Sequence, residues 1–145
     1  AVEFRRQSWY KAAVAQSLVN YCRDLRLTLV AADEPHQLPA SVPFLLATST
    51  PELAMIRLHG RNVAGWNHPG AEWRKQRTLY TYSAEEIAAL ARQLRALTPA
   101  PKETCVIFNN NSGGAAAGNA LDLVKELDLH FSGLVPREPE QLDLF

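Results

Sequence analysis

The chain has 145 residues, of which 47% are hydrophobic and 21% charged, as in an average globular domain with one core. Its 15 basic and 15 acidic residues give a formal net charge of zero, which excludes the basic excess typical of proteins that bind nucleic acid non-specifically. The longest apolar run, residues 42–47, contains Pro43 and is far shorter than the roughly 20 residues of a membrane-spanning helix. We therefore expect no membrane span.

The amino terminus and the two cysteines indicate the cellular setting. Residues 1–6 have neither an initiator methionine nor the pattern of a secretion signal, so the chain is expected to start inside a longer protein. Cys22 and Cys105 lie among apolar neighbours without the spacing of metal ligands, and we expect both to be reduced thiols. Reduced thiols favour a cytoplasmic location.

Four strands and three helices are predicted to alternate along the chain. The first helix follows Ser8 and carries Leu18 and Leu25 on its apolar face. The second follows a capping box that begins at Ser83, and the third follows Gly114. The strands are predicted over residues 2–6, 27–33, 53–60 and 104–110.

This alternation predicts an α/β fold with a parallel sheet. In the first strand Val2 and Phe4 face one side, and the charged residues that alternate with them face the other. One apolar and one charged face are typical of a barrel wall, with helices outside and polar groups inside. Four strands are half of a TIM (β/α)8 barrel, which needs about 250 residues. Residues 1–132 are expected to form this half, and an upstream segment or a partner chain the other half.

Polar residues stand at the carboxyl ends of the predicted strands, which open on one face of a parallel barrel. We expect His59 or Glu3 to transfer a proton, and Asp33 to orient the substrate or ligate. Asn109 and Asn110 would hold the ligand, or instead anchor the turn into the last helix.

Three arginines are candidates for binding anionic oxygen: Arg5, Arg6 and Arg57. A structural alternative stands beside this interpretation. In it, Glu3, Arg5 and Arg57 form a buried ion-pair network that fills the barrel, and His59 is a structural histidine. The sequence leaves both interpretations open.

Residues 61–82 form a connection longer than an ordinary loop between a strand and a helix, and such loops are often functional. The cations Arg74 and Arg77 accompany the rings of Trp66 and Trp73, which suits a ligand with phosphates and bases or sugars. The alternative is a lid whose tryptophans pack on the barrel rim and whose charges are solvated.

Residues 133–145 are predicted to form an extended tail. Its last five residues resemble the pentapeptide by which bacterial replication and repair proteins dock on the sliding clamp. The anchoring residues would be Gln141, Leu142, Leu144 and Phe145. Alternatively, the same apolar side chains seal the barrel or cover a sheet edge.

Five short segments together resemble the YecE-like family, domain of unknown function 72, and the resemblance extends over nearly the whole chain. The segments occur in the family's order: Glu3-Phe4-Arg5-Arg6-Gln7-Ser8-Trp9, Arg57-Leu58-His59-Gly60, Tyr80-Thr81-Tyr82-Ser83-Ala84-Glu85-Glu86, Phe108-Asn109-Asn110-Asn111 and Gly118-Asn119-Ala120. The resemblance implies a TIM-barrel fold, of which this chain would be the carboxy-terminal half.

The chain departs from the family pattern where Arg6 replaces a frequent histidine, Gln7 a proline and Asn111 an aspartate. These differences reduce the number of metal ligands, so a divalent metal is not supported by this half alone and no metal ligand is assigned. We expect an enzyme, a hydrolase or an isomerase, acting on a phosphate- or sugar-containing substrate or on nucleic acid. The alternative is a non-catalytic module that binds single-stranded nucleic acid or is recruited by the sliding clamp.

Overall fold

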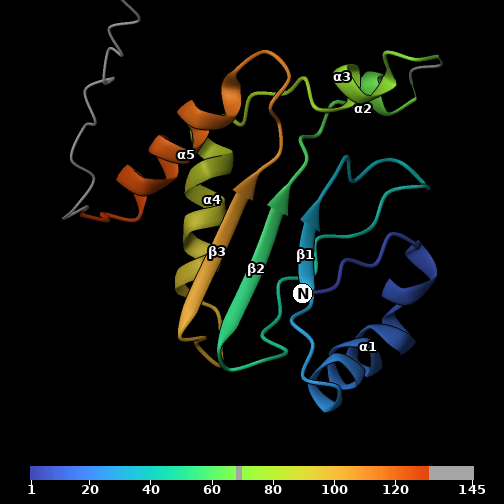
Figure 1. Ribbon diagram of the computed structural model, residues 1–145, viewed down its shortest axis with the longest axis vertical. Coiled ribbons are helices and arrows are strands. Elements are labelled where there is room, and N and C mark those ends of the chain that lie inside the picture. The colour runs from blue at the N-terminus through green and yellow to red at the C-terminus, as the bar shows by residue number, and fades with distance from the viewer. Residues whose placement is uncertain (68–69, 131–145) are drawn as a thin grey trace, which may run out of the picture.

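The computed structural model describes residues 1–67 and 70–130, which adopt an α/β fold around a parallel sheet. The described sheet has three strands in the order β1-β2-β3 (Figure 1). These are β1 (Val30–Asp33), β2 (Leu53–Leu58) and β3 (Glu103–Phe108). Because all the strands run in the same direction, their carboxyl ends lie at one edge of the sheet.

The prediction of four strands requires a correction, because residues 2–6 form only one bridge. The Val2 N–H donates to the Thr28 carbonyl at 2.8 Å, and the Val2 carbonyl accepts from the Val30 N–H at 2.9 Å. Two residues later, the Phe4 carbonyl accepts from the Tyr10 hydroxyl at 3.0 Å instead of from a neighbouring strand. Extended pairing therefore stops after Val2.

The helices follow the predicted order with adjusted ends. The 3-10 helix η1 (Gln7–Tyr10) precedes α1 (Ala12–Asp24), so Ser8 does not cap α1. Leu25 is the carboxyl cap of α1 and is 53% exposed, so it does not belong to the apolar face. The other long helices are α4 (Ala84–Arg95) and α5 (Ala115–Glu126).

The capping box of α4 is confirmed. The Glu86 N–H donates to the Ser83 hydroxyl at 3.3 Å, and the Ser83 N–H donates to the Glu86 carboxylate at 2.9 Å. These two bonds satisfy backbone donors that a helix start leaves without partners.

Two hydrophobic clusters pack the elements together. Figure 1 shows α4 and α5 side by side along β3, and α1 at the other end of the sheet near β1. Between the sheet and α4 and α5, the buried residues include Ile56, Leu58, Ile87, Leu90 and Leu123. The second cluster joins α1 to β1 and includes Leu18, Val19, Cys22, Leu29 and Ala32.

The connection over residues 61–82 holds two short helices, α2 (Val63–Trp66) and α3 (Trp73–Arg77), beyond the carboxyl ends of the strands (Figure 1). The Asn62 amide donates to the carbonyls of Gln76 at 2.8 Å and Leu79 at 3.1 Å, and its oxygen accepts from the Gly65 N–H at 3.1 Å. The Asn62 side chain therefore links the start of α2 to the end of α3.

Within the described ranges, the longest helices lack the length and the apolar composition needed to cross a membrane. The predicted tail, with Gln141, Leu142, Leu144 and Phe145, lies outside the described residues.

Candidate functional site

The carboxyl edge of the sheet separates neighbouring residues onto its two faces. Asp33 is in register with Leu58, and Leu58 with Phe108. Leu58 is buried against α4 and Phe108 packs beside it, so this face is the one that the helices cover. Because side chains alternate along a strand, the next residue of each strand points to the opposite face. Those next residues are Glu34, His59 and Asn109.

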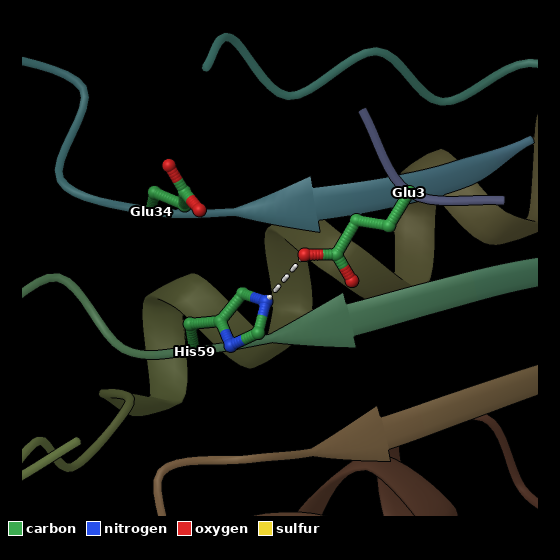
Figure 2. Close-up of side chains that lie close together, drawn as sticks. All are labelled: Glu3, Glu34 and His59. Carbon is green, nitrogen blue, oxygen red and sulfur yellow. Dashed lines mark hydrogen bonds and ion pairs between the residues drawn. The ribbon is translucent and has the colours of Figure 1, made fainter. Parts of the chain in front are cut away.

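On that opposite face, Glu3 lies at the centre of a cluster of ions. Its carboxylate is 2.6 Å from Arg5 Nη1 and 2.7 Å from Arg57 Nη1. The same carboxylate is 3.2 Å from His59 Nε2 (Figure 2). Arg5 also pairs with the buried carboxylate of Glu34. Three segments that are distant in sequence, residues 3–5, 34 and 57–59, therefore converge at this edge.

The electrostatics of the cluster keep Glu3 ionised. Burial alone would raise the pKa of Glu3, but the hydrogen bonds from His59, Arg5 and Arg57 outweigh burial and hold the pKa well below its usual range. A permanent carboxylate at this position can orient the His59 ring through its contact with Nε2.

His59 is held at both of its ring nitrogens. Its side chain is only 5% exposed, and Nδ1 lies 3.0 Å from the Asn109 amide nitrogen. When that amide donates to Nδ1, the neutral ring carries its proton on Nε2, which faces Glu3 at 3.2 Å. The arrangement fixes the plane of the His59 ring, and proton exchange with a substrate would require the substrate to replace one of these two partners.

The cluster also contains donors that a metal ion could use. Glu3, Glu34 and His59 offer ligand atoms within 4.8 Å of one another. The Arg5 guanidinium, however, pairs with both carboxylates, so it already neutralises the charge that would attract a cation. These side chains therefore fit a guanidinium-bridged carboxylate pair better than a metal centre.

A hollow of about 550 Å³ opens beside His59 and brings several predicted site residues together. His59 and Asn109 come from the strand ends, and Trp73, Arg74 and Arg77 come from α3. The remaining lining residues are Lys75, Thr78, Asn111 and Ser112. The hollow is therefore bounded by the connections that follow β2 and β3.

Arg77 occupies an unusual position in this hollow. Its guanidinium lies 3.7 Å from the centre of the Trp66 ring, and Trp66 also has Arg5 at 5.7 Å. Arg77 Nη2 is 3.9 Å from Glu34, and among the described residues its buried Nε has no hydrogen-bond partner. Burial and then the neighbouring Arg5 lower the pKa of Arg77. A bound anion would relieve both effects.

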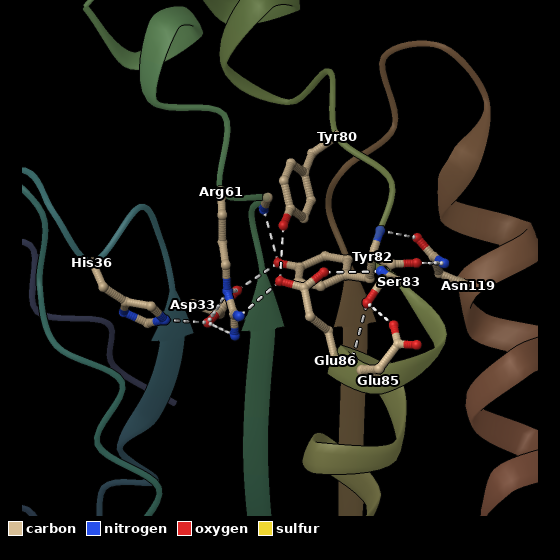
Figure 3. A network of polar contacts seen from close by, with 10 residues as sticks. Asp33, His36, Arg61, Tyr80, Tyr82, Ser83, Glu85, Glu86 and Asn119 are labelled. Atoms are coloured by element: carbon tan, nitrogen blue, oxygen red, sulfur yellow. Dashed lines mark hydrogen bonds and ion pairs between the residues drawn. The ribbon is translucent and has the colours of Figure 1, made fainter.

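Asp33 does not join this cluster, because it points to the face covered by α4 (Figure 3). Its carboxylate makes a bidentate pair with Arg61, at 2.9 Å from Nε and 2.8 Å from Nη2. It also accepts from the Tyr82 hydroxyl at 2.7 Å, and His36 Nε2 lies 3.4 Å away. The burial of Tyr82 and the neighbouring Asp33 raise the pKa of Tyr82.

Arg61 connects Asp33 to helix α4. Its Nη1 donates to Glu86 at 2.8 Å, and the Tyr80 hydroxyl donates to the same carboxylate oxygen at 2.8 Å. Burial would lower the pKa of Arg61, but its hydrogen bonds to Asp33 and the nearby acidic charges raise it overall. This network positions the start of α4 against the sheet.

Three further candidates are also placed away from the hollow. Asn110 is fully buried, and its amide donates to the Tyr80 carbonyl at 2.9 Å and to Asn119 at 3.0 Å. Asn110 therefore holds the chain that leads into α4. Arg6 is exposed before η1, and Trp66 contacts the guanidinium groups of Arg5 and Arg77 but does not line the hollow.

Sequence reasoning missed Glu34, and also Thr78 and Ser112 in the hollow. The signal for Glu34 was available, because a register that puts His59 and Asn109 on one face also puts Glu34 there. No local pattern indicates that Thr78 and Ser112 meet, since they are 34 positions apart.

These observations define an α/β protein with a polar site beyond the carboxyl ends of parallel strands. The family model described as "Protein of unknown function DUF72" matches residues 1–143, and the chain belongs to this family. It is 37% identical over 147 residues to the UPF0759 protein YunF of Bacillus subtilis (strain 168), covering 100% of this chain and 51% of YunF.

Solved structures of the family have the same fold. The chain is similar to a DUF72 family protein from Enterococcus faecalis V583, with a TM-score of 0.85 and 43% identity over 94% of this chain and 50% of that one. It is also similar to a DUF72 family protein from Thermotoga maritima MSB8, with a TM-score of 0.75 and 37% identity over 88% of this chain and 45% of that one. The chain thus spans about half the length of these relatives.

Proposed function

We propose that the chain supplies the carboxy-terminal half of a TIM barrel, whose active site lies at the carboxyl ends of the strands. The parallel sheet, the alternating helices and the half-length match to the relatives support this proposal. So does an apolar hollow of about 430 Å³ beside β3, which includes Val106, Phe108, Leu123 and Leu127. The other half, from an upstream segment or a partner chain, would cover this surface.

Within this barrel, we infer an enzyme site that acts on a phosphate- or sugar-containing substrate. The observation that carries the inference is the hollow in which His59 and Asn109 face the cations of α3. His59 would transfer a proton, and Arg77 would bind anionic oxygen. Glu3 would orient the His59 ring and offset the positive charge that the ring gains with a proton. Proton transfer of this kind serves a hydrolase and an isomerase alike. The two free cysteines suit a cytoplasmic enzyme.

A turnover screen with sugar phosphates and other phosphate esters tests this function. His59→Gln should lower the turnover of any accepted substrate by about 100-fold or more, the usual contribution of a general acid or base. His130→Gln is the matched control, because His130 is exposed beyond α5. Equal turnover by the wild type and His59→Gln would remove His59 from the reaction.

A second candidate function is the binding of single-stranded nucleic acid. Trp73 favours it, because this ring is 38% exposed, with Arg74 at 5.4 Å and Arg77 at 5.6 Å from its centre. Stacking of bases on Trp73 predicts that Trp73→Ala weakens oligothymidine binding at low salt, measured by fluorescence anisotropy. Trp9→Ala is the control, since Trp9 is exposed and packs on Phe4. Equal binding by both variants would contradict this function.

Recruitment by the bacterial sliding clamp is a separate proposal on the last five residues. It depends on their match to the clamp-binding pentapeptide. Deleting residues 141–145 should abolish co-purification with the clamp, whereas retention of the clamp by the shortened chain would refute recruitment through Gln141, Leu142, Leu144 and Phe145.

A further inference from the structure

The outer part of the hollow is a place where two connections are joined. The segment after β2 and the segment after β3 form a parallel bridge between Leu79 and Ser112. Beside it, the Thr78 and Ser112 hydroxyls lie 2.7 Å apart, and Thr78 also donates to the Arg74 carbonyl at 3.2 Å. Two hydroxyl groups are thereby fixed next to each other on a paired backbone.

The charge around these hydroxyls is one-sided. Arg74, Lys75 and Arg77 line the hollow, and none of its described lining residues is acidic. The ion cluster around Glu3 differs, since its carboxylates are already paired with guanidinium groups. Lys75 has its own partner outside the lining, Glu72 at 3.0 Å. The uncompensated charge therefore lies with the arginines.

Arg77 is prepared for an anion. Its side chain is 17% exposed, and stacking on Trp66 at 3.7 Å fixes the plane of the guanidinium. Trp66 is itself held by the α2–α3 pair, where Asn62 binds both short helices. Since the nearest carboxylate is 3.9 Å away, the buried Nε retains an unused donor among the described residues.

We propose that this outer part of the hollow is a phosphate subsite, formed by Arg77, Thr78 and Ser112, that binds the terminal phosphate of a small phosphomonoester. The inference rests on the proposed function and names its substrate class. A phosphate accepts hydrogen bonds from guanidinium and hydroxyl groups together. Because Thr78 donates its proton to the Arg74 carbonyl, the proton offered to a phosphate is that of Ser112, whose hydroxyl would turn from Thr78 to the anion. The connections after the last strands of TIM barrels are also frequent sites of phosphate binding.

The subsite orients the substrate. With its phosphate at Thr78 and Ser112, a polyol chain would extend along the hollow toward Asn109 and His59, which line the same space. A volume of about 550 Å³ accommodates a small phosphorylated sugar or polyol. The phosphate is therefore a binding handle, and the chemistry takes place at the other end of the molecule.

Calorimetric titration of the chain with glycerol 3-phosphate, inorganic phosphate and glycerol tests the subsite. Glycerol 3-phosphate and inorganic phosphate should bind and glycerol should not. Arg77→Gln should weaken glycerol 3-phosphate binding at least about tenfold, as expected for loss of a charge-assisted hydrogen bond. Arg92→Gln, an exposed position on α4, should leave the affinity unchanged. Similar affinities for Arg77→Gln and Arg92→Gln would overturn the proposal.

A second variant tests the subsite without changing the α2–α3 pair. Ser112→Ala removes one hydroxyl without altering Arg77 or Trp66, and it should weaken the same binding about fivefold or more. The subsite would also be overturned if Ser112→Ala bound glycerol 3-phosphate with unchanged affinity and glycerol bound as tightly as glycerol 3-phosphate.

The subsite and the enzyme function fail in different ways. His59→Gln should retain affinity for inorganic phosphate within about twofold, because His59 lines the hollow but does not belong to the proposed subsite. If His59→Gln keeps full turnover while Arg77→Gln loses phosphate binding, the enzyme function fails and the subsite stands. If turnover depends on His59 but phosphate binding is indifferent to Arg77, the subsite fails and the enzyme function stands.

Discussion

Asp33 and Glu34 are adjacent carboxylates with different surroundings. Glu34 faces Arg5 and the ion cluster around Glu3, whereas Asp33 is buried against Arg61 and Tyr82 on the helix-covered face. The difference follows from the alternation of side chains at the end of β1. Glu34 therefore belongs to the ion cluster of the candidate site, whereas Asp33 holds α4 against the sheet through Arg61.

Asp33→Asn tests the structural role of Asp33. Removing the charge of Asp33 leaves Arg61 with Glu86 alone of its two carboxylate partners at 2.8 Å, and it should lower the free energy of unfolding by about 3 kcal/mol. Urea denaturation measures the change. Asp122→Asn, at an exposed position of α5, should stay within about 0.5 kcal/mol of the wild type. Equal stabilities of the two variants would contradict this role.

Glu3 predicts a defined dependence of stability on pH. Its pKa in the folded protein lies below the ordinary value of 4.5, so its contribution is complete above that value and is lost as the pH falls. The wild type should therefore exceed Glu3→Gln in unfolding free energy at pH 7, and the difference should narrow below pH of about 4.5. Urea denaturation at several pH values measures this difference. If the difference in unfolding free energy between the wild type and Glu3→Gln grew as the pH fell, the predicted direction of the pH dependence would be wrong.

The α2–α3 pair depends on close backbone approach. A Cβ at Gly65 would lie 2.1 Å from the Gln76 carbonyl oxygen, too close for the two short helices to keep their packing. Gly65→Ala should lower the unfolding free energy by about 1–3 kcal/mol and shift tryptophan emission to the red as Trp66 loses its cover. Denaturation followed by fluorescence measures both effects.

Gly118 provides the matched control for Gly65. It lies inside α5, and a Cβ there would have open space. Gly118→Ala should therefore raise the unfolding free energy by about 0.5–1 kcal/mol, because alanine favours the helix over the unfolded chain. If Gly65→Ala stabilises the protein as Gly118→Ala does, the α2–α3 packing described above is incorrect.

At the scale of the whole molecule, the surface beside the edge strand β3 is apolar. Thr104, Val106 and Phe108 line a hollow with Leu123 and Leu127, and β3 is one of the two edge strands of the described sheet. Edge strands pair with other strands or pack against apolar surfaces unless charged residues oppose this. In the relatives, about half of the chain lies outside the matched region and is available to cover such a surface.

The apolar surface beside β3 predicts that the 145-residue chain self-associates in isolation. Sedimentation velocity should show association that increases with concentration, and Thr104→Lys should reduce it because a charge on an edge strand opposes pairing. Ser17→Lys, at an exposed position of α1, should have no effect. A wild-type chain that is monomeric at every concentration would contradict the prediction.

Local signals were sufficient for the order of the elements. The apolar and polar alternation of residues 53–58, the Ser83 capping box and the glycines before α5 each act over a few residues, and each appears in the structure. The first strand was overestimated, since the same alternation in residues 2–6 does not ensure a pairing partner beyond Val2. The two short helices in residues 61–82 also escaped prediction, because Asn62 and Gly65 hold them through contacts across the loop.

The primary structure was enough to establish the family, the parallel α/β arrangement and the location of His59 at a strand end, because these depend on short-range patterns. Folding in three dimensions chose the partners of each charged group. Glu3 meets His59 across 56 positions, and Thr78 meets Ser112 across 34. The alternation of side chains at the end of β1 directs Asp33 toward α4 and Glu34 toward Arg5. Such pairings depend on strand register and long-range packing, which no local stretch of residues encodes alone.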